Sequence, residues 1–141
     1  MLSYRHAFHA ANHADVLKHL VLYFCLDYLN NKSKPYLYLD THAGAGSYKL
    51  QESYAAINKE WQSGITRLLD RPDTGSEDQT PAAVLDYLQL VRRYYDSDSS
   101  YPGSPLIAAT RMRGQDRAVL YELHTGDYDL LKTLFASDKR I

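Results

Sequence analysis

The chain has 141 residues, of which 45% are hydrophobic and 23% are charged, a composition typical of one globular domain or part of one. Its formal net charge of -1 argues against a general nucleic-acid-binding protein, because such proteins usually carry a clear basic excess. The single cysteine excludes an intrachain disulfide, and no apolar run reaches the roughly 18 residues of a membrane span. We therefore expect a cytoplasmic protein without a membrane partner.

Charge is distributed unevenly along the chain. Residues 1–50 hold five Lys and Arg against three Asp and Glu, residues 51–100 hold five against nine, and residues 101–141 hold six against five. Because nucleic-acid phosphates attract basic side chains, we expect any RNA-facing surface to lie outside the acidic middle third.

Apolar spacing predicts a first helix from Asn12 to about Asn30. Its apolar residues recur at three- and four-residue steps, as on one face of an amphipathic helix, at Leu17, Leu20, Val21, Phe24 and Tyr28. After a turn-rich segment, residues 36–40 are a short apolar and aromatic run that indicates a buried parallel strand. A loop of small residues, 41–47, follows this strand.

The middle of the chain reads as a helical hairpin. Helical spacing over residues 53–70 leads into a polar, turn-rich loop at 71–78, and a second helix starts at Thr80 and Pro81. We predict no strand between these helices, and we assign residues 52–99 to an inserted helical subdomain.

The last part of the chain predicts a short helix at 104–112, a strand at 118–122 and a helix at 127–135. Without the hairpin, helices and strands alternate, which favours an α/β fold with a parallel sheet. Two strands are too few for such a sheet. Residues 1–51 and 100–141 are therefore expected to form the first part of an incomplete α/β core.

The loop after the first strand carries the most informative pattern. Asp40 ends the strand, and Gly44 and Gly46 follow at the strand's carboxyl end, where open α/β sheets bind ligands. A dinucleotide fingerprint requires a third glycine where Lys49 stands, which disfavours a nicotinamide-dependent oxidoreductase. The pattern looks like the first motif of class I methyltransferases, in which the loop holds the methionine part of the cofactor and a carboxylate is available for its ammonium group. An ordinary tight turn is the alternative.

Glu122 stands at the end of the second predicted strand. A carboxylate there can accept hydrogen bonds from both hydroxyls of a ribose, although it can also be an ordinary strand-end side chain in solvent. It follows Asp40 by 82 residues, a separation that fits a nucleotide fold only if the helical hairpin is an insertion.

Four of the six histidines lie in the N-terminal segment. His9 and His13 have the i, i+4 spacing that can place two imidazoles on one metal, but no cysteine or glutamate nearby completes such a site. We therefore expect no metal site, and we assign these histidines to capping, packing or substrate contact.

Four stretches of the sequence together resemble the bacterial family that methylates the N6 of an adenine in 23S ribosomal RNA: Met1 to His6, Asn12 to His19, Tyr38 to Gly46 and Tyr101 to Ala108. The resemblance spans both ends of the chain and is weak only in the hairpin. It implies a class I, Rossmann-like fold dependent on S-adenosylmethionine, with an inserted helical subdomain, and a complete protein that is a monomer.

The resemblance also implies roles for individual residues. Tyr4 and His6 would reach the target adenine. A second group would line the pocket of S-adenosylmethionine beside the glycine loop, namely Lys18, His19, His42, Ser104 and Glu122.

One departure from the family pattern limits these implications. The catalytic Asp-Pro-Pro-Tyr string of amine methylation does not occur in the 141 residues. The sequence therefore predicts the cofactor-binding part of a 23S ribosomal RNA methyltransferase, inactive alone. The alternative is a noncatalytic module that binds the cofactor or RNA without chemistry.

Overall fold

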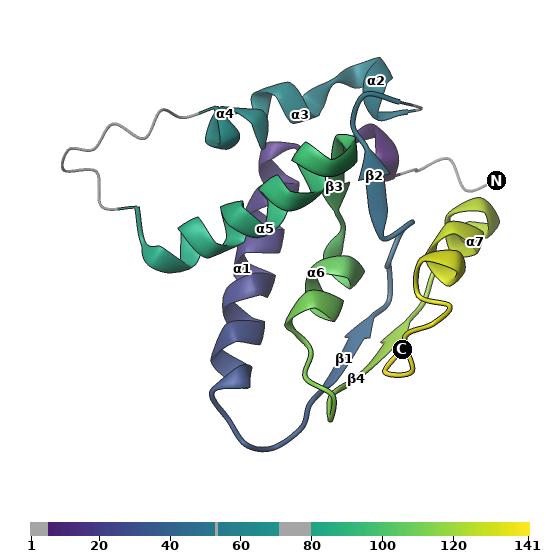
Figure 1. Cartoon of the computed structure of the whole chain (residues 1–141). Coiled ribbons are helices and arrows are strands. Elements are labelled where there is room, and N and C mark those ends of the chain that lie inside the picture. The colour runs from purple at the N-terminus through teal and green to yellow at the C-terminus, as the bar shows by residue number, and fades with distance from the viewer. Residues whose placement is uncertain (1–5, 53, 71–79) are drawn as a thin grey trace.

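The computed structural model describes residues 6–52, 54–70 and 80–141 (Figure 1). A single 3-10 turn, η1 (His6–Phe8), precedes the first helix. The helices are α1 (His13–Asn30), α2 (Ala55–Asn58), α3 (Glu60–Ser63), α4 (Thr66–Leu69), α5 (Ala82–Asp98), α6 (Ser104–Arg111) and α7 (Thr125–Leu134). The strands are β1 (Leu37–Asp40), β2 (Ser47–Lys49), β3 (Ser100–Pro102) and β4 (Arg117–Leu120). No helix in these ranges is long and apolar enough to cross a membrane.

The two predicted strands pair as expected. β1 and β4 are parallel neighbours, with Leu37 opposite Arg117 and Asp40 opposite Leu120. Two backbone hydrogen bonds extend this pairing beyond the strands, from Tyr121 N to Asp40 O at 2.8 Å and from Ala43 N to Tyr121 O at 3.0 Å. The carboxyl ends of β1 and β4 therefore lie side by side, which confirms the mixed α/β architecture with a parallel pair.

Helix α1 begins where the sequence predicts, because Asn12 caps it by accepting a hydrogen bond from Asp15 N at 2.9 Å. The predicted apolar stripe is nevertheless not the buried face. Leu17, Val21 and Tyr28 are exposed, whereas the buried residues are Asp15, Val16, His19, Tyr23 and Leu26. The helix is apolar on two sides, so spacing alone cannot tell which side meets the core.

The predicted helix over residues 53–70 is wrong as a continuous element. Within the described part of this segment, three four-residue helices, α2 to α4, take its place. Lys59 has a left-handed backbone with φ 52°, and Gly64 has φ -98° and ψ -109°, so neither residue continues a helix. A Cβ on Gly64 would lie 2.1 Å from Ala11 O, so this close approach requires glycine.

A short antiparallel ribbon, which periodicity does not predict, joins the two ends of residues 52–99, the segment predicted to be a helical insertion. Strands β2 and β3 pair with Tyr48 opposite Tyr101, and Leu50 N donates to Ser99 O at 3.0 Å. Both strands have three residues, too few for a period of two to be seen. The core of the molecule runs through this ribbon, so the insertion and the flanking segments share one set of buried residues.

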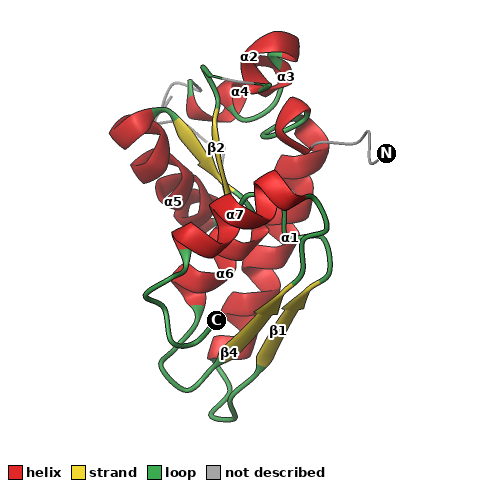
Figure 2. Ribbon diagram, turned by 90° about the vertical axis from the view of Figure 1, so that its right-hand side faces the viewer, coloured by secondary structure: helices red, strands yellow, loops and turns green. Residues whose placement is uncertain are grey.

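One side of the molecule is left apolar and exposed. In Figure 2 no helix of the described residues crosses the near face of the β1–β4 pair. The side chains of Leu37, Leu39 and Val119 are 61%, 54% and 37% exposed, in agreement with an incomplete sheet.

Candidate functional site

A cavity of about 470 Å³ opens at the carboxyl ends of β1 and β4. Five segments meet around it: the N-terminal turn and α1, the loop after β1, strand β2, the start of α6, and the segment from β4 into α7. Its lining residues are His6, Asp15, Lys18, His19, Thr41, His42, Ala43, Gly44, Tyr48, Gly103, Ser104, Glu122, Leu123, His124 and Asp127. The size is within the range of small-molecule sites, and the position is the usual one for ligands of open α/β sheets.

Most residues that the sequence assigns to a cofactor or substrate site come together in this cavity, although they span 117 positions of the chain. They are His6, Lys18, His19, His42, Gly44, Ser104 and Glu122. Tyr4 lies outside the described residues. Asp40 and Gly46 do not line the cavity.

Asp40 differs from its expected role. The sequence predicts a carboxylate available to a ligand ammonium group, but the side chain already accepts three hydrogen bonds from within the protein. The donors are Tyr38 Oη at 2.7 Å, Ser104 Oγ at 2.6 Å and His42 N at 3.0 Å. Asp40 therefore fixes the start of the glycine loop to the start of α6 behind the cavity wall.

Two glycines of the loop after β1 have a left-handed backbone, which glycine adopts more readily than other residues. Gly44 has φ +62° and Gly46 has φ +79°, so a side chain at either position would be strained. A Cβ on Gly44 would lie 2.0 Å from Tyr48 Oη, and one on Gly46 would lie 2.8 Å from Leu134 Cδ2. Gly44 thus forms the cavity floor, whereas Gly46 allows α7 to pack against the loop.

Glu122 connects the glycine loop to the end of β4. Its Oε2 accepts a hydrogen bond from Gly44 N at 2.8 Å, and its Oε1 accepts one from His124 N at 2.7 Å. Each carboxylate oxygen has a second lone pair, and the side chain lines the cavity. Glu122 can therefore hold the loop and still accept two further hydrogen bonds from a ligand.

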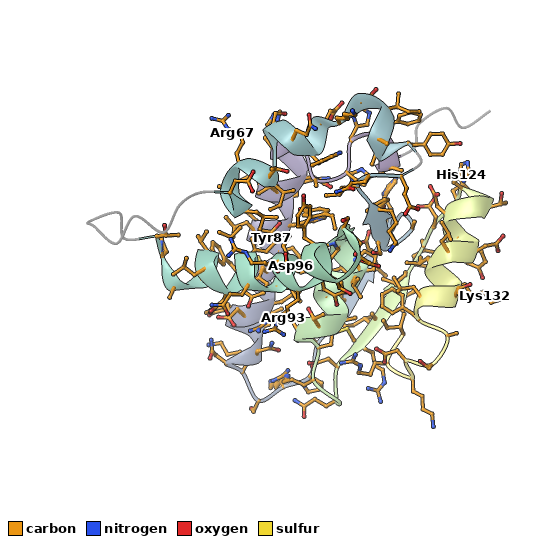
Figure 3. The ribbon with its side chains drawn as sticks, turned by 45° about the horizontal axis from the view of Figure 1, so that its top comes forward. Arg67, Tyr87, Arg93, Asp96, His124 and Lys132 are labelled. Atoms are coloured by element: carbon orange, nitrogen blue, oxygen red, sulfur yellow. The ribbon has the colours of Figure 1, made fainter. Side chains whose placement is uncertain are left out.

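Three other acidic or histidine residues of the cavity have no role assigned from the sequence. His124 and Asp127 come from the start of α7, and Figure 3 shows His124 at that end of the helix. The buried His124 Nδ1 has no hydrogen-bond partner among the described residues and lies 4.0 Å from Asp127 Oδ2. The third residue is Asp15. The signal that could have identified it is its place three residues after the capping asparagine Asn12, on the first turn of α1.

The N-terminal histidines form no metal site in the described part of the chain. His9 Nδ1 lies 3.0 Å from Glu60 Oε1 of the insertion, and no group of three His, Cys, Asp or Glu side chains is arranged for a metal there. His9 instead fastens the segment before α1 to α3.

The sequence of the chain is similar to those of known proteins. The family described as "Ribosomal RNA large subunit methyltransferase D, RlmJ" matches residues 33–141. The chain is 47% identical over 142 residues to ribosomal RNA large subunit methyltransferase J of Escherichia coli K12, covering 99% of this chain and 49% of that protein. It is 44% identical over 144 residues to the protein of the same name from Haemophilus influenzae, covering 100% of this chain and 49% of that protein.

A solved structure is also similar. The crystal structure of a protein from Legionella pneumophila aligns with a TM-score of 0.73 and 38% identity, over 86% of this chain and 43% of that one. The chain spans about half the length of the curated relatives that it matches. The resemblance of the sequence is thereby confirmed, and the chain belongs to the ribosomal RNA large subunit methyltransferase J family.

Proposed function

We propose that this chain is the cofactor-binding part of a class I, Rossmann-like methyltransferase that transfers a methyl group from S-adenosylmethionine to the N6 of an adenine in 23S ribosomal RNA. The observation that carries the proposal is the cavity at the carboxyl ends of β1 and β4, with a glycine loop on one side and Glu122 on the other. The names of the relatives support ribosomal RNA as the substrate.

The residues of the cavity fit S-adenosylmethionine in charge and hydrogen bonding. The free lone pairs of Glu122 can accept from the two ribose hydroxyls of the cofactor. His124 Nδ1 is a buried nitrogen without a partner among the described residues, which a polar ligand group would satisfy. Lys18 offers a cation for the cofactor's carboxylate, and Asp127 offers an anion for its ammonium group. The bound cofactor would supply an electrophilic methyl group.

On the substrate side, His6 lies at the cavity edge, where its ring packs edge-on against Tyr48 with ring centroids 5.3 Å apart. An adenine must leave its helical stack to reach such a cavity. We assign His6 and Tyr4 to contact with that base. We assign no acceptor for its amino group, because the sequence contains no Asp-Pro-Pro-Tyr string.

Ligand titration tests the cofactor assignment on the chain itself. Calorimetry should show that S-adenosylmethionine and its demethylated product bind with one-to-one stoichiometry, whereas NADH should not bind. Binding of NADH in place of S-adenosylmethionine would refute the proposal in favour of an oxidoreductase.

Methyl transfer tests the reaction in the intact protein that carries this chain. With radiolabelled S-adenosylmethionine and 23S ribosomal RNA transcripts, label should appear as N6-methyladenosine. Tyr4→Ala should lower this transfer while leaving cofactor affinity nearly unchanged. Cofactor binding without transfer by the intact protein would instead support a noncatalytic module.

A further inference from the structure

Asp15 is a buried carboxylate in the cavity wall to which no role has yet been assigned. Its side chain is 1% exposed and lies on the first turn of α1. Asp15 Oδ2 is 2.9 Å from His6 Nε2 and 3.1 Å from Ala11 N, and Asp15 Oδ1 is 2.9 Å from Lys18 Nζ. One carboxylate thus contacts both the proposed substrate residue and a proposed cofactor residue.

Asp15 carries its negative charge despite its burial. Burial would raise the pKa of this carboxyl, but the hydrogen bond from His6, the nearby imidazole charges and Lys18 together hold it well below its usual range. His6 Nε2 therefore donates a hydrogen bond to the carboxylate, and Lys18 Nζ forms an ion pair with it.

A chain of buried hydroxyl groups ends at the same carboxylate. Burial lowers the pKa of His19 to about 4, so near neutral pH its imidazole carries one N–H. His19 Nε2 lies 3.8 Å from Asp15 Oδ1, and its Nδ1 forms a hydrogen bond of 2.8 Å with Tyr101 Oη.

The row of contacts continues to α5. Tyr87 Oη lies 2.9 Å from Tyr101 Oη, so one of these hydroxyl groups donates to the other. Tyr87 is fully buried on α5 (Figure 3). Buried polar groups therefore lie in a continuous row from α5 to the wall of the cavity.

We propose that Asp15 is a positioning residue of the methyl-transfer site, which holds the His6 imidazole and the Lys18 ammonium together at one wall of the cavity. The inference rests on the proposed function of this cavity. The Lys18 side chain is 64% exposed and has four rotatable carbon bonds, so the contact with Asp15 is what fixes its end. The turn that precedes α1 accounts for the contact with Ala11 N, but not for the contacts with the two side chains.

A double-mutant cycle in the intact protein tests the positioning role. Asp15→Ala removes both carboxylate oxygens and should lower the kcat of methyl transfer about 10- to 100-fold at saturating cofactor, because two groups at the site lose their placement. Adding His6→Ala to Asp15→Ala should cause no further loss, since His6 is already displaced. Independent, multiplying losses would overturn the proposal.

The matched control is a second buried aspartate at the opposite end of the parallel pair. Asp116 is fully buried, and its oxygens accept from Tyr36 N at 3.1 Å and Arg113 N at 2.8 Å. Asp116→Ala should lower the unfolding temperature as Asp15→Ala does, yet leave kcat within about twofold. An equal loss of kcat in both variants would show that Asp15 acts only through stability.

Histidine resonances provide a readout that does not depend on activity. In nitrogen-15 spectra of the wild-type protein, His19 should show a neutral imidazole near neutral pH, and His6 should show a slowly exchanging Nε2–H that Asp15→Ala removes. Persistence of that His6 signal would overturn the positioning role. If these spectra agree but the wild-type protein transfers no methyl group, the proposed function fails and the placement of His6 by Asp15 stands.

Discussion

Replacement of Glu122 by alanine should weaken both the cofactor site and the fold. The carboxylate accepts two short hydrogen bonds, from Gly44 N at 2.8 Å and His124 N at 2.7 Å, and Glu122→Ala leaves both donors without this partner. We expect a loss of about 1–3 kcal/mol in the free energy of unfolding, because unpaired partly buried donors cost that much. The ribose hydroxyls lose a charged acceptor as well, so the cofactor Kd should rise by about 5- to 150-fold.

Calorimetry with S-adenosylmethionine, combined with urea unfolding, measures both effects. Asp116→Ala is the matched control, because it removes a buried carboxylate that accepts backbone hydrogen bonds far from the cavity. It should destabilise the fold without changing the Kd. An unchanged Kd in Glu122→Ala with an intact circular dichroism spectrum would remove Glu122 from the cofactor site, and an equal rise in both variants would show that the effect is one of stability.

Three further predictions follow from features of the same structure. Gly44→Ala should lower the unfolding temperature and abolish cofactor binding in calorimetry, because its Cβ would lie 2.0 Å from Tyr48 Oη at a φ of +62°; wild-type affinity would contradict this. Between pH 6.5 and about 4, His19 is protonated in the unfolded chain but neutral in the folded chain. The free energy of unfolding should therefore fall by up to about 3 kcal/mol as the pH falls through this window. Urea unfolding at several pH values should show a smaller fall in His19→Asn. The chain alone should self-associate at high concentration in light scattering, with Leu39→Glu reducing the effect, since Leu37, Leu39 and Val119 are exposed on one face of the β1–β4 pair.

The sequence predicts the elements that carry strong local patterns. A capped apolar helix, two short apolar strands and a glycine loop between them are local features, and the structure has all of them close to the expected positions. The parallel pairing of β1 and β4 also follows from the alternation of helices and strands. Because the carboxyl ends of parallel strands lie side by side, this topology is enough to predict that residues following β1 and β4 meet in one cavity.

The rest depends on tertiary contacts that local patterns do not encode. Both faces of α1 are apolar, and only packing against α5 and α6 decides that Tyr23 is buried while Val21 is exposed. The break at Gly64 arises from the approach of the Ala11 carbonyl, which is 53 residues away in the sequence. The contact between Asp15 and His6 could not be predicted for a similar reason, because it forms only when η1 folds back over the start of α1.

The attachment of the insertion to the segment before α1 has a consequence for protein engineering. Ile65 N donates to Ala11 O at 3.0 Å, Asn12 Nδ2 donates to Glu60 Oε2 at 2.9 Å, and His9 contacts the same carboxylate. Residues 52–99 are therefore not a detachable module that a short linker could replace. A shortened chain would keep β1, β4 and the glycine loop, but it would lose the contacts that hold the segment carrying His6 and Lys18. A redesign of this region must therefore keep the partners of His9, Ala11 and Asn12 together with the helices.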